Sequence, residues 1–427
     1  MHNLFQFNRK LCKFANYFLT DMDTTYRLHT LANGLRVVYS RRPGNVAYCG
    51  LAVNAGSRDE EPSLYGLAHF VEHTIFKGTR KRRAWHILNR MELVGGELNA
   101  YTTKEETLVY SVFPSGNMER AVELISDLVM NSVFPEKELE KEREVVLEEI
   151  HSYLDTPSEA IYDDFEDMIF SGNSLGHNIL GTEECLSRMG TEECRRYLKS
   201  LYVPENMVLF AVGSIAEDKM FRLAERYFSP MHHTLVRNPR VPVTMSPVFS
   251  EVKSIDSHQA HTVVGVPTFG MHDNRKYALL LLNNMLGGPG MNSILNVAIR
   301  ERRGYAYTVE SSVTLFSDCG LFTVYFGSDE RQVRKCLKII DNEIDHIASG
   351  GMKEKALEAA KKQYVGQLLV SSENPESHAL SLGKGILNFG QVNTINEIAD
   401  MIRAVSAEEL RSVAESISGK CSSLIFV

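Results

Sequence analysis

Two stretches of the sequence repeat the same order of secondary-structure signals, and this repeat limits the folds that the chain can adopt. The segment GGELNAYTTKEETLVYSVFPSGNMERAVELISDLV, from residue 95, predicts two strands, a short turn and a helix. The segment RGYAYTVESSVTLFSDCGLFTVYFGSDERQVRKCLKIIDNEI, from residue 303, predicts the same order, which indicates two copies of one unit. Because strands and helices do not alternate regularly, we predict an α+β fold of two homologous domains, each a mostly antiparallel sheet with helices packed on one face.

The domain boundaries follow from the distribution of prolines and periodic segments. A chain of 427 residues is long enough for two domains with separate cores. Between about residues 229 and 250 the sequence is rich in proline and has no clear period, which is typical of a linker. We therefore expect an N-terminal extension at 1–23, a first domain at 24–230, a linker at 231–250 and a second domain at 251–427.

Charge, hydropathy and cysteine content exclude several classes of protein. The net charge of −8 disfavours a nucleic-acid partner, because such proteins usually carry a basic surface. We find no apolar run long enough to span a membrane, and polar residues interrupt the N-terminal segment, so it lacks the apolar core of a signal peptide. Seven cysteines without CxxC pairing indicate reduced thiols. We predict a cytoplasmic protein, with an organelle matrix as the alternative.

The segment HFVEH carries the first sign of chemistry. His69 and His73 are four positions apart on a predicted helix, so both imidazoles project from one face and can share a metal ion. Glu72 lies on that face too. We expect this helix to begin at Pro62 and to end at Gly78. Its core-facing side carries Leu64, Ala68, Val71 and Ile75.

A second helix supplies a carboxylate for such a site. A catalytic zinc needs a third protein ligand and an open fourth position. In ELEKEREVVLEEIHSYLD, Glu142 and Glu149 lie at heptad spacing on the same side as the apolar stripe, whereas Glu148 faces away. Carboxylates on a buried side need a cation beside them, so this helix provides the missing ligand.

These motifs resemble those of a known family. HFVEH, followed 76 positions after its second histidine by Glu149, resembles the inverted zinc motif of the pitrilysin and insulinase metallopeptidases, which include the mitochondrial processing peptidase subunits. The resemblance covers nearly the whole chain from about Tyr26. It implies that His69, His73 and Glu149 bind one zinc ion per chain and that Glu72 is the general base. Sites of this composition also accept cobalt or manganese.

The resemblance extends to residues outside the metal motif. It implies that Glu142 supports a ligand histidine, with a purely structural buried acid as the alternative. GGELNAYT places Asn99 and Ala100 where the family pairs its backbone with an extended peptide, and IRERRGYAY places Arg300 and Tyr307 where it keeps residues that contact substrate and the developing oxyanion. One departure is that SGNSLGHNILGT lacks the proline expected in that turn, and we expect this to affect the turn and not the site.

The function implied by the resemblance is a zinc-dependent endopeptidase for unfolded peptides, in which Glu72 activates the attacking water. Two alternatives are a processing peptidase for targeting segments and a non-enzymatic core subunit of the same fold, although such subunits have lost motif residues that this chain keeps. Longer relatives enclose a chamber with four domains. A chain of two domains therefore implies a homodimer, in which each zinc site receives Arg300 and Tyr307 from the partner chain.

Overall fold

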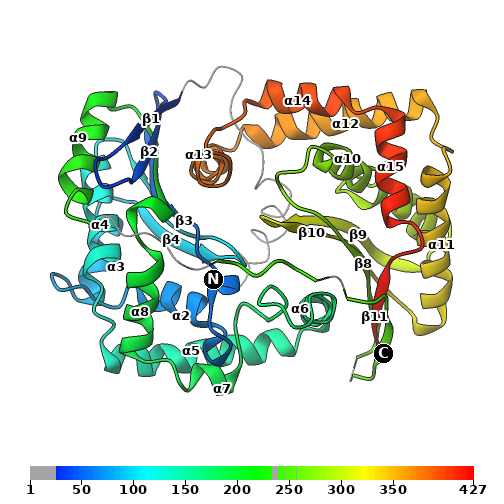
Figure 1. Cartoon of the computed structure of the whole chain (residues 1–427), viewed down its shortest axis with the longest axis horizontal. Helices are drawn as coiled ribbons and strands as arrows, with labels where there is room; N and C mark the ends of the chain where they lie inside the picture. Colours follow the sequence, from blue (N-terminus) through cyan, green and yellow to red (C-terminus); the bar gives the residue numbers. More distant parts are fainter. Residues whose placement is uncertain (1–25, 233–238, 245, 256) are drawn as a thin grey trace.

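The computed structural model describes residues 26–232, 239–244, 246–255 and 257–427, so the predicted extension at 1–23 and part of the predicted linker lie outside the described residues. Two sheets stand side by side, each with helices on its outer face (Figure 1). This arrangement confirms the α+β fold of two similar units. None of the helices within these ranges is long and apolar enough to cross a membrane.

The first unit contains a six-stranded sheet and most of the N-terminal helices. Its strands are β1 (Tyr26–Thr30), β2 (Arg36–Arg41), β3 (Val46–Val53), β4 (Glu97–Thr102), β5 (Thr107–Pro114) and β6 (Met207–Gly213). Its helices are η1 (Ser57–Asp59), η2 (Pro62–Leu64), α2 (Leu67–Thr74), α3 (Ala84–Glu92), α4 (Met118–Asn131), α5 (Glu136–Leu154), α6 (Pro157–Ile169), α7 (Glu183–Leu186), α8 (Thr191–Leu201), η3 (Pro204–Asn206) and α9 (Glu217–Phe228).

The second unit contains a five-stranded sheet. Its strands are β7 (Ser250–Lys253), β8 (Ala260–Phe269), β9 (Ala306–Leu315), β10 (Cys319–Ser328) and β11 (Ser422–Phe426). Its helices are α10 (Lys276–Gly287), η4 (Asn296–Glu301), α11 (Glu330–Ala348), α12 (Glu354–Ser372), α13 (Pro375–Phe389), α14 (Ile395–Ala404) and α15 (Ala407–Ile417).

Both sheets share one topology. The order β2-β6-β3-β5-β4 in the first sheet corresponds to β7-β11-β8-β10-β9 in the second. In each order the first pair is parallel and the other pairs are antiparallel. The additional strand β1 forms a hairpin with β2. This shared order is the structural form of the sequence repeat.

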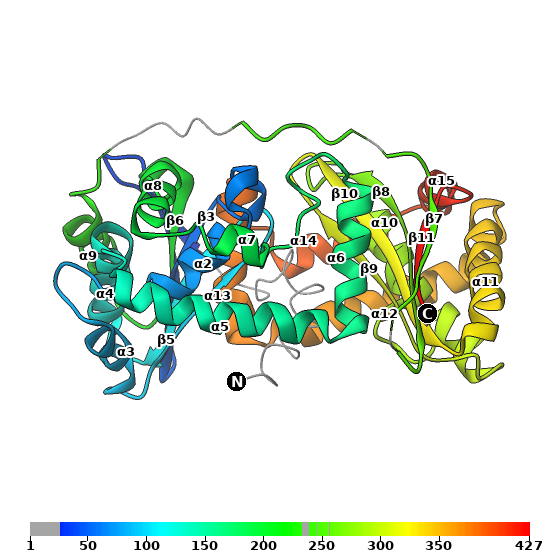
Figure 2. The same cartoon turned by 90° about the horizontal axis from the view of Figure 1, so that it is seen from below.

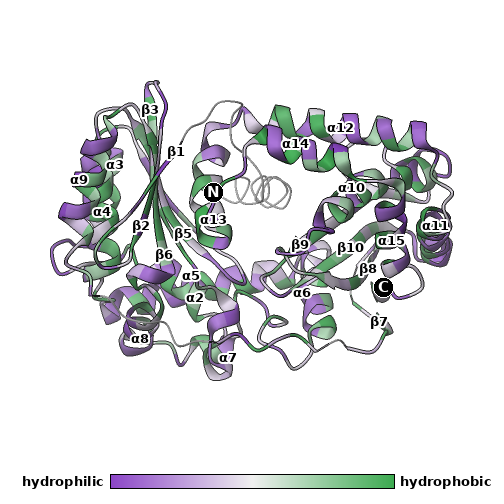
Figure 3. Ribbon diagram, turned by 45° about the horizontal axis from the view of Figure 1, so that its top comes forward, coloured by the Kyte–Doolittle hydropathy of each residue, from purple (hydrophilic) through white to green (hydrophobic). Residues whose placement is uncertain are grey.

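The inner strands of both sheets are buried on both faces, whereas the sequence predicted helices on one face only. Hydrophobic residues run along the strands of both sheets (Figure 3), and every residue of β6 is buried. Alternate residues of a strand point to opposite faces. Leu209 and Ala211 accordingly join the core formed with the first unit's own helices, whereas Val208 and Phe210 pack with residues of α13.

In each unit, one helix packs on the sheet of the other unit. Helix α13 lies between β10 and β11 of the second sheet in sequence but packs on β6 and β3 of the first, and α6 packs on β8 and β11 of the second (Figures 1 and 2). The fit of α13 is close, because a Cβ atom at Gly383 or at Gly50 would overlap the Phe210 ring. The two units form one body through this exchange.

A buried network of charged groups also joins the units. Arg58, which follows β3, donates to Glu105 at 2.6 Å and to Asp318, in the turn between β9 and β10, at 2.7 Å. Arg240, from the predicted linker, donates to both carboxylate oxygens of Asp59 at 2.9 Å. Because Arg58 is almost completely buried, removing one of its partners leaves a charge without full compensation.

Candidate metal centre

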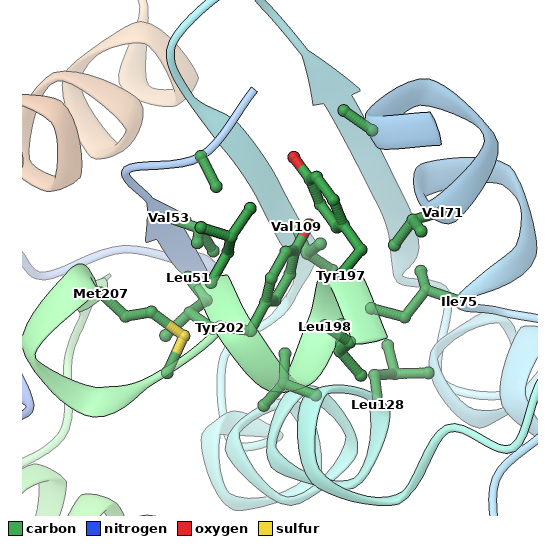
Figure 4. Close-up of a cluster of buried hydrophobic side chains, with 14 of the residues drawn as sticks. Leu51, Val53, Val71, Ile75, Val109, Leu128, Tyr197, Leu198, Tyr202 and Met207 are labelled. Atoms are coloured by element: carbon green, nitrogen blue, oxygen red, sulfur yellow. The ribbon is translucent and has the colours of Figure 1, made fainter. Parts of the chain in front are cut away.

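Helix α2 is held by its apolar side. Val71 and Ile75 lie in the core cluster beside Leu198 and Leu128 (Figure 4). This packing fixes the rotation of the helix, so the side that carries His69 and His73 faces α5. The helix is shorter than the sequence predicted. Residues 62–64 form a separate 3-10 turn, and α2 begins only at residue 67.

Three potential ligand atoms meet between α2 and α5. The Nε2 atoms of His69 and His73 lie 3.1 Å apart. Glu149 Oε2 lies 3.7 Å from the first of these atoms and 3.5 Å from the second. Two ligand atoms about 2.0–2.2 Å from a tetrahedral ion lie roughly 3.3–3.6 Å from each other. The observed separations of 3.1, 3.5 and 3.7 Å are close to this range, so small shifts would let the three side chains hold one zinc ion. They form a possible metal-binding group in the described part of the chain.

Glu142 lies behind the histidines. Its Oε1 is 3.0 Å from His73 Nδ1, and its Oε2 is 2.5 Å from Lys77 Nζ. Burial alone would raise the pKa of Glu142, but the hydrogen bonds to His73 and Lys77 lower it on balance. An ionised Glu142 accepts a hydrogen bond from the Nδ1–H group of His73, which leaves the Nε2 lone pair directed at the group of ligand atoms.

Glu72 stands on α2 next to the candidate ligand His73. It is only 8% exposed. Burial raises the pKa of Glu72, while a hydrogen bond from Thr102, in β4, and the charge of His73 oppose that rise. A carboxylate with a raised pKa is suited to accept a proton near neutral pH. Glu72 does not belong to the group of three ligand atoms.

Strand β4 runs beside α2. Within the described ranges it pairs only with β5, so its other edge is open to a further strand. Asn99 and Ala100 lie in the middle of this strand and are half-buried. Because an extended peptide can join such an edge through main-chain hydrogen bonds, a peptide added here would run beside the helix that carries the histidines.

Arg300 and Tyr307 lie in the second unit, on η4 and at the start of β9. The Arg300 guanidinium lies 5.3 Å from the centre of the Tyr307 ring, and Tyr307 is 78% exposed. Both line an open pocket of about 400 Å³ whose other lining residues also belong to the second unit. The structure thus brings the three ligand candidates and Glu142 together, but it groups Arg300 and Tyr307 separately.

Sequence reasoning missed two residues at this site. Lys77 had no role in the sequence analysis, yet it contacts Glu142. Its position four residues after His73 was the available signal, because residues at that spacing share a helix face. Thr102, which bonds Glu72, gave no signal because the contact joins two different elements.

Comparisons with known proteins agree with this geometry. Residues 36–183 match the family described as Insulinase (Peptidase family M16), and residues 189–364 match the Peptidase M16 inactive domain. A protein of Streptomyces coelicolor named as an uncharacterized zinc protease is 33% identical, over 94% of this chain and 89% of that protein. The uncharacterized zinc protease YmxG of Bacillus subtilis is 32% identical, over 91% of this chain and 95% of that protein.

Solved structures show the same fold. A protease from Helicobacter pylori superposes with a TM-score of 0.88 at 19% identity, covering 95% of this chain and all of that one. A structure from Pseudomonas fluorescens, described as a peptidase M16 inactive domain, has a TM-score of 0.86 at 16% identity and covers 94% of this chain and 97% of that one. At such identities the likeness concerns the fold alone.

Proposed function

The chain belongs to the insulinase family, peptidase family M16, and from this premise we propose that it is a zinc-dependent endopeptidase with His69, His73 and Glu149 as the metal ligands. The observation that carries the proposal is the spacing of the three ligand atoms, which matches one tetrahedral ion. The names of the relatives, which are called zinc proteases, support the choice of metal. We expect one zinc ion per chain.

Two residues beside the proposed ligands, Glu72 and Glu142, have separate roles in the reaction. When bound, zinc supplies a Lewis acid that polarises the scissile carbonyl and acidifies water. Glu72, buried beside the proposed ligands, takes the proton from the attacking water and passes it to the leaving amine. Glu142 holds the imidazole of His73 in the tautomer that leaves Nε2 free to bind metal.

The open edge of β4 supports an unfolded peptide as the substrate. Main-chain hydrogen bonds to the backbone near Asn99 and Ala100 require an extended segment and make little demand on its sequence. A folded protein offers few such segments. We therefore propose that the enzyme cleaves oligopeptides and unfolded chains.

The separate position of Arg300 and Tyr307 supports a homodimer. In one chain they line a pocket of the second unit alone. In a symmetric dimer the second unit of one chain can face the first unit of its partner, so each metal site receives an arginine and a tyrosine from the other chain. The exposure of Tyr307 is consistent with such a role.

Metal removal tests the proposal directly. A chelator should abolish cleavage of a quenched fluorescent peptide, and added zinc should restore it, because the ligands lose their ion and regain it. Metal content should be about one zinc per chain by atomic emission. Full activity of protein shown to be free of metal would overturn the proposal.

A further inference from the structure

Helix α2 begins without a cap of its own. Its N-cap is Gly66, with φ of 102° and no side chain to bond the first N–H groups. No larger residue fits there, because a Cβ atom on Gly66 would lie 2.6 Å from the Leu180 carbonyl oxygen. The N–H groups at the start of the metal-bearing helix therefore need an acceptor from elsewhere in the chain.

Glu60 is that acceptor. Its Oε2 accepts a hydrogen bond from the N–H of Gly66 at 2.8 Å, and its Oε1 accepts one from the N–H of Ala68 at 2.6 Å. The side chain of Glu60 is completely buried. A carboxylate at a helix N-terminus is stabilised by the helix dipole as well as by these two bonds. Ala68 directly precedes His69. The Glu60 carboxylate is therefore hydrogen-bonded to the helical turn that carries this proposed ligand.

Glu60 is in turn held by His177. The Nε2 atom of His177 lies 2.9 Å from Glu60 Oε2, and its ring stacks on Tyr65 with the ring centres 3.5 Å apart. Burial, and then the charge of Lys104, lower the pKa of His177. Burial raises the pKa of Glu60, and the hydrogen bonds from Ala68 and Gly66 oppose that rise. Lys104 donates to the carbonyl oxygen of His177. The carboxylate of Glu60 is thus hydrogen-bonded to two N–H groups of α2 and to His177, and His177 is itself held by Tyr65 and Lys104.

His177 belongs to the segment SGNSLGHNILGT. This segment lies against the start of α2. Its Leu180 carbonyl excludes a side chain at Gly66, and a Cβ atom at Gly181 would overlap the carbonyl oxygen of Tyr65. The segment and the start of the metal helix are packed together too tightly to move independently.

We propose that Glu60 is a positioning residue for the metal site. Its buried carboxylate fixes the first turn of α2, and thereby the imidazole of His69, so that a metal ion meets a preformed pair of histidines. Groups that orient metal ligands raise affinity because the ion does not have to order them. This inference rests on the proposed function, since it concerns the same ligands.

The test is Glu60→Gln with Glu61→Gln as the matched control. An amide has one oxygen, so its NH₂ group must face one of the two N–H donors that the carboxylate now accepts. Glu61 is the exposed neighbour of Glu60 and has no such bonds. We expect Glu60→Gln to weaken zinc binding about tenfold and to shift the visible absorption of the cobalt-substituted protein. Glu61→Gln should match the parent in both measurements.

Three outcomes are distinguishable. A folded Glu60→Gln protein, by circular dichroism, with the parent's zinc affinity and cobalt spectrum would overturn the inference. If that variant does not fold, His177→Leu replaces it, because this change keeps Glu60 but removes the contact at 2.9 Å. Parental metal affinity in folded His177→Leu would also overturn the inference. Failure of the parent itself to bind zinc or cobalt would overturn the metal site, and the positioning role with it.

Discussion

The two units fold the same sheet, yet they differ where the candidate ligands lie. When the sequences of α5 and α12 are aligned from their first residues, Pro157 corresponds to Pro375 and Glu149 corresponds to Gln367. Gln367 is a neutral amide where the first unit has a carboxylate. Among the described residues, the one group of potential metal ligands lies in the first unit. Within the described part of the chain, the shared scaffold thus carries the candidate ligands in its first copy.

The helices that follow β3 and β8 differ in burial as well. All residues of α10 are buried, and it packs against β9, α12, α14 and α15. Helix α2 is covered on its core side but leaves His73 partly exposed. A helix that is covered all round cannot present ligands to a substrate, so the second unit lacks both the residues and the open face.

The largest expected effect separates the proposed base from the ligands. Glu72→Gln should keep zinc, because Glu72 is not one of the three ligand candidates. Turnover should fall on the order of 10²- to 10⁴-fold, the usual scale for a lost general base. Zinc content and peptide cleavage are measured on the same sample. Turnover within a few-fold of the parent would assign the base to another group.

Glu149→Gln makes α5 resemble α12 at the decisive position. Loss of a carboxylate ligand should weaken zinc affinity by more than about 100-fold, since losing only an outer partner of a ligand already costs about 10- to 100-fold. The control is Glu148→Gln, which changes an exposed neighbour. Affinities are compared by competition with a chromophoric chelator. Equal losses of zinc affinity in the two variants would show that Glu149 is not a metal ligand, and Glu149 would then not distinguish the first unit from the second.

Gly383→Ala tests the exchange of helices between the units. The added methyl group would overlap the buried Phe210 ring, so we expect a loss of about 1–3 kcal/mol in the free energy of unfolding in urea. Gly366→Ala, in α12, is the control, because nothing lies within 4 Å of its added Cβ atom and alanine favours a helix by about 1 kcal/mol. If both variants gain stability, α13 does not depend on this fit.

Mixing two variants tests whether the units of different chains share a site. Glu72→Gln and Tyr307→Phe proteins should each be nearly inactive. After subunit exchange, half of the dimers are mixed and one of their two sites has both intact residues, so roughly a quarter of the parent activity should return. Exchange is followed with differently labelled chains. No recovery despite exchange would place Tyr307 with its own chain's metal or make it a packing residue.

The smallest effect concerns the charged network between the units. Burial alone would raise the pKa of Asp318, but the hydrogen bonds and charge of Arg58 lower it below 3.8. A lowered folded-state pKa contributes stability above pH 3.8, and this contribution is lost as the pH falls through the folded value. Asp318→Asn should therefore lower the melting temperature at pH 7 by roughly 2–4 °C. A deficit that persists unchanged at pH 3 would contradict this account.

Local patterns explain what the sequence could predict. The strand pair β4–β5 and the side of α5 that carries Glu142 and Glu149 follow from periodicity within one segment. The start of α2 could not be predicted, because Gly66 ends the preceding turn against Leu180, more than a hundred residues away. One feature of the sequence indicated that both sheet faces are covered. This is the unbroken apolar run of β6, which is typical of a strand buried on both sides.

The exchange of α6 and α13 has a consequence for the integrity of the chain. A cut between residues 239 and 244 would sever the covalent connection, but each fragment would still hold a helix that the other fragment's sheet requires. The pieces should therefore stay together as a nicked complex under native conditions and separate only in denaturant. Conversely, either half expressed alone would expose the apolar sheet face that its missing helix covers, and we expect it to aggregate.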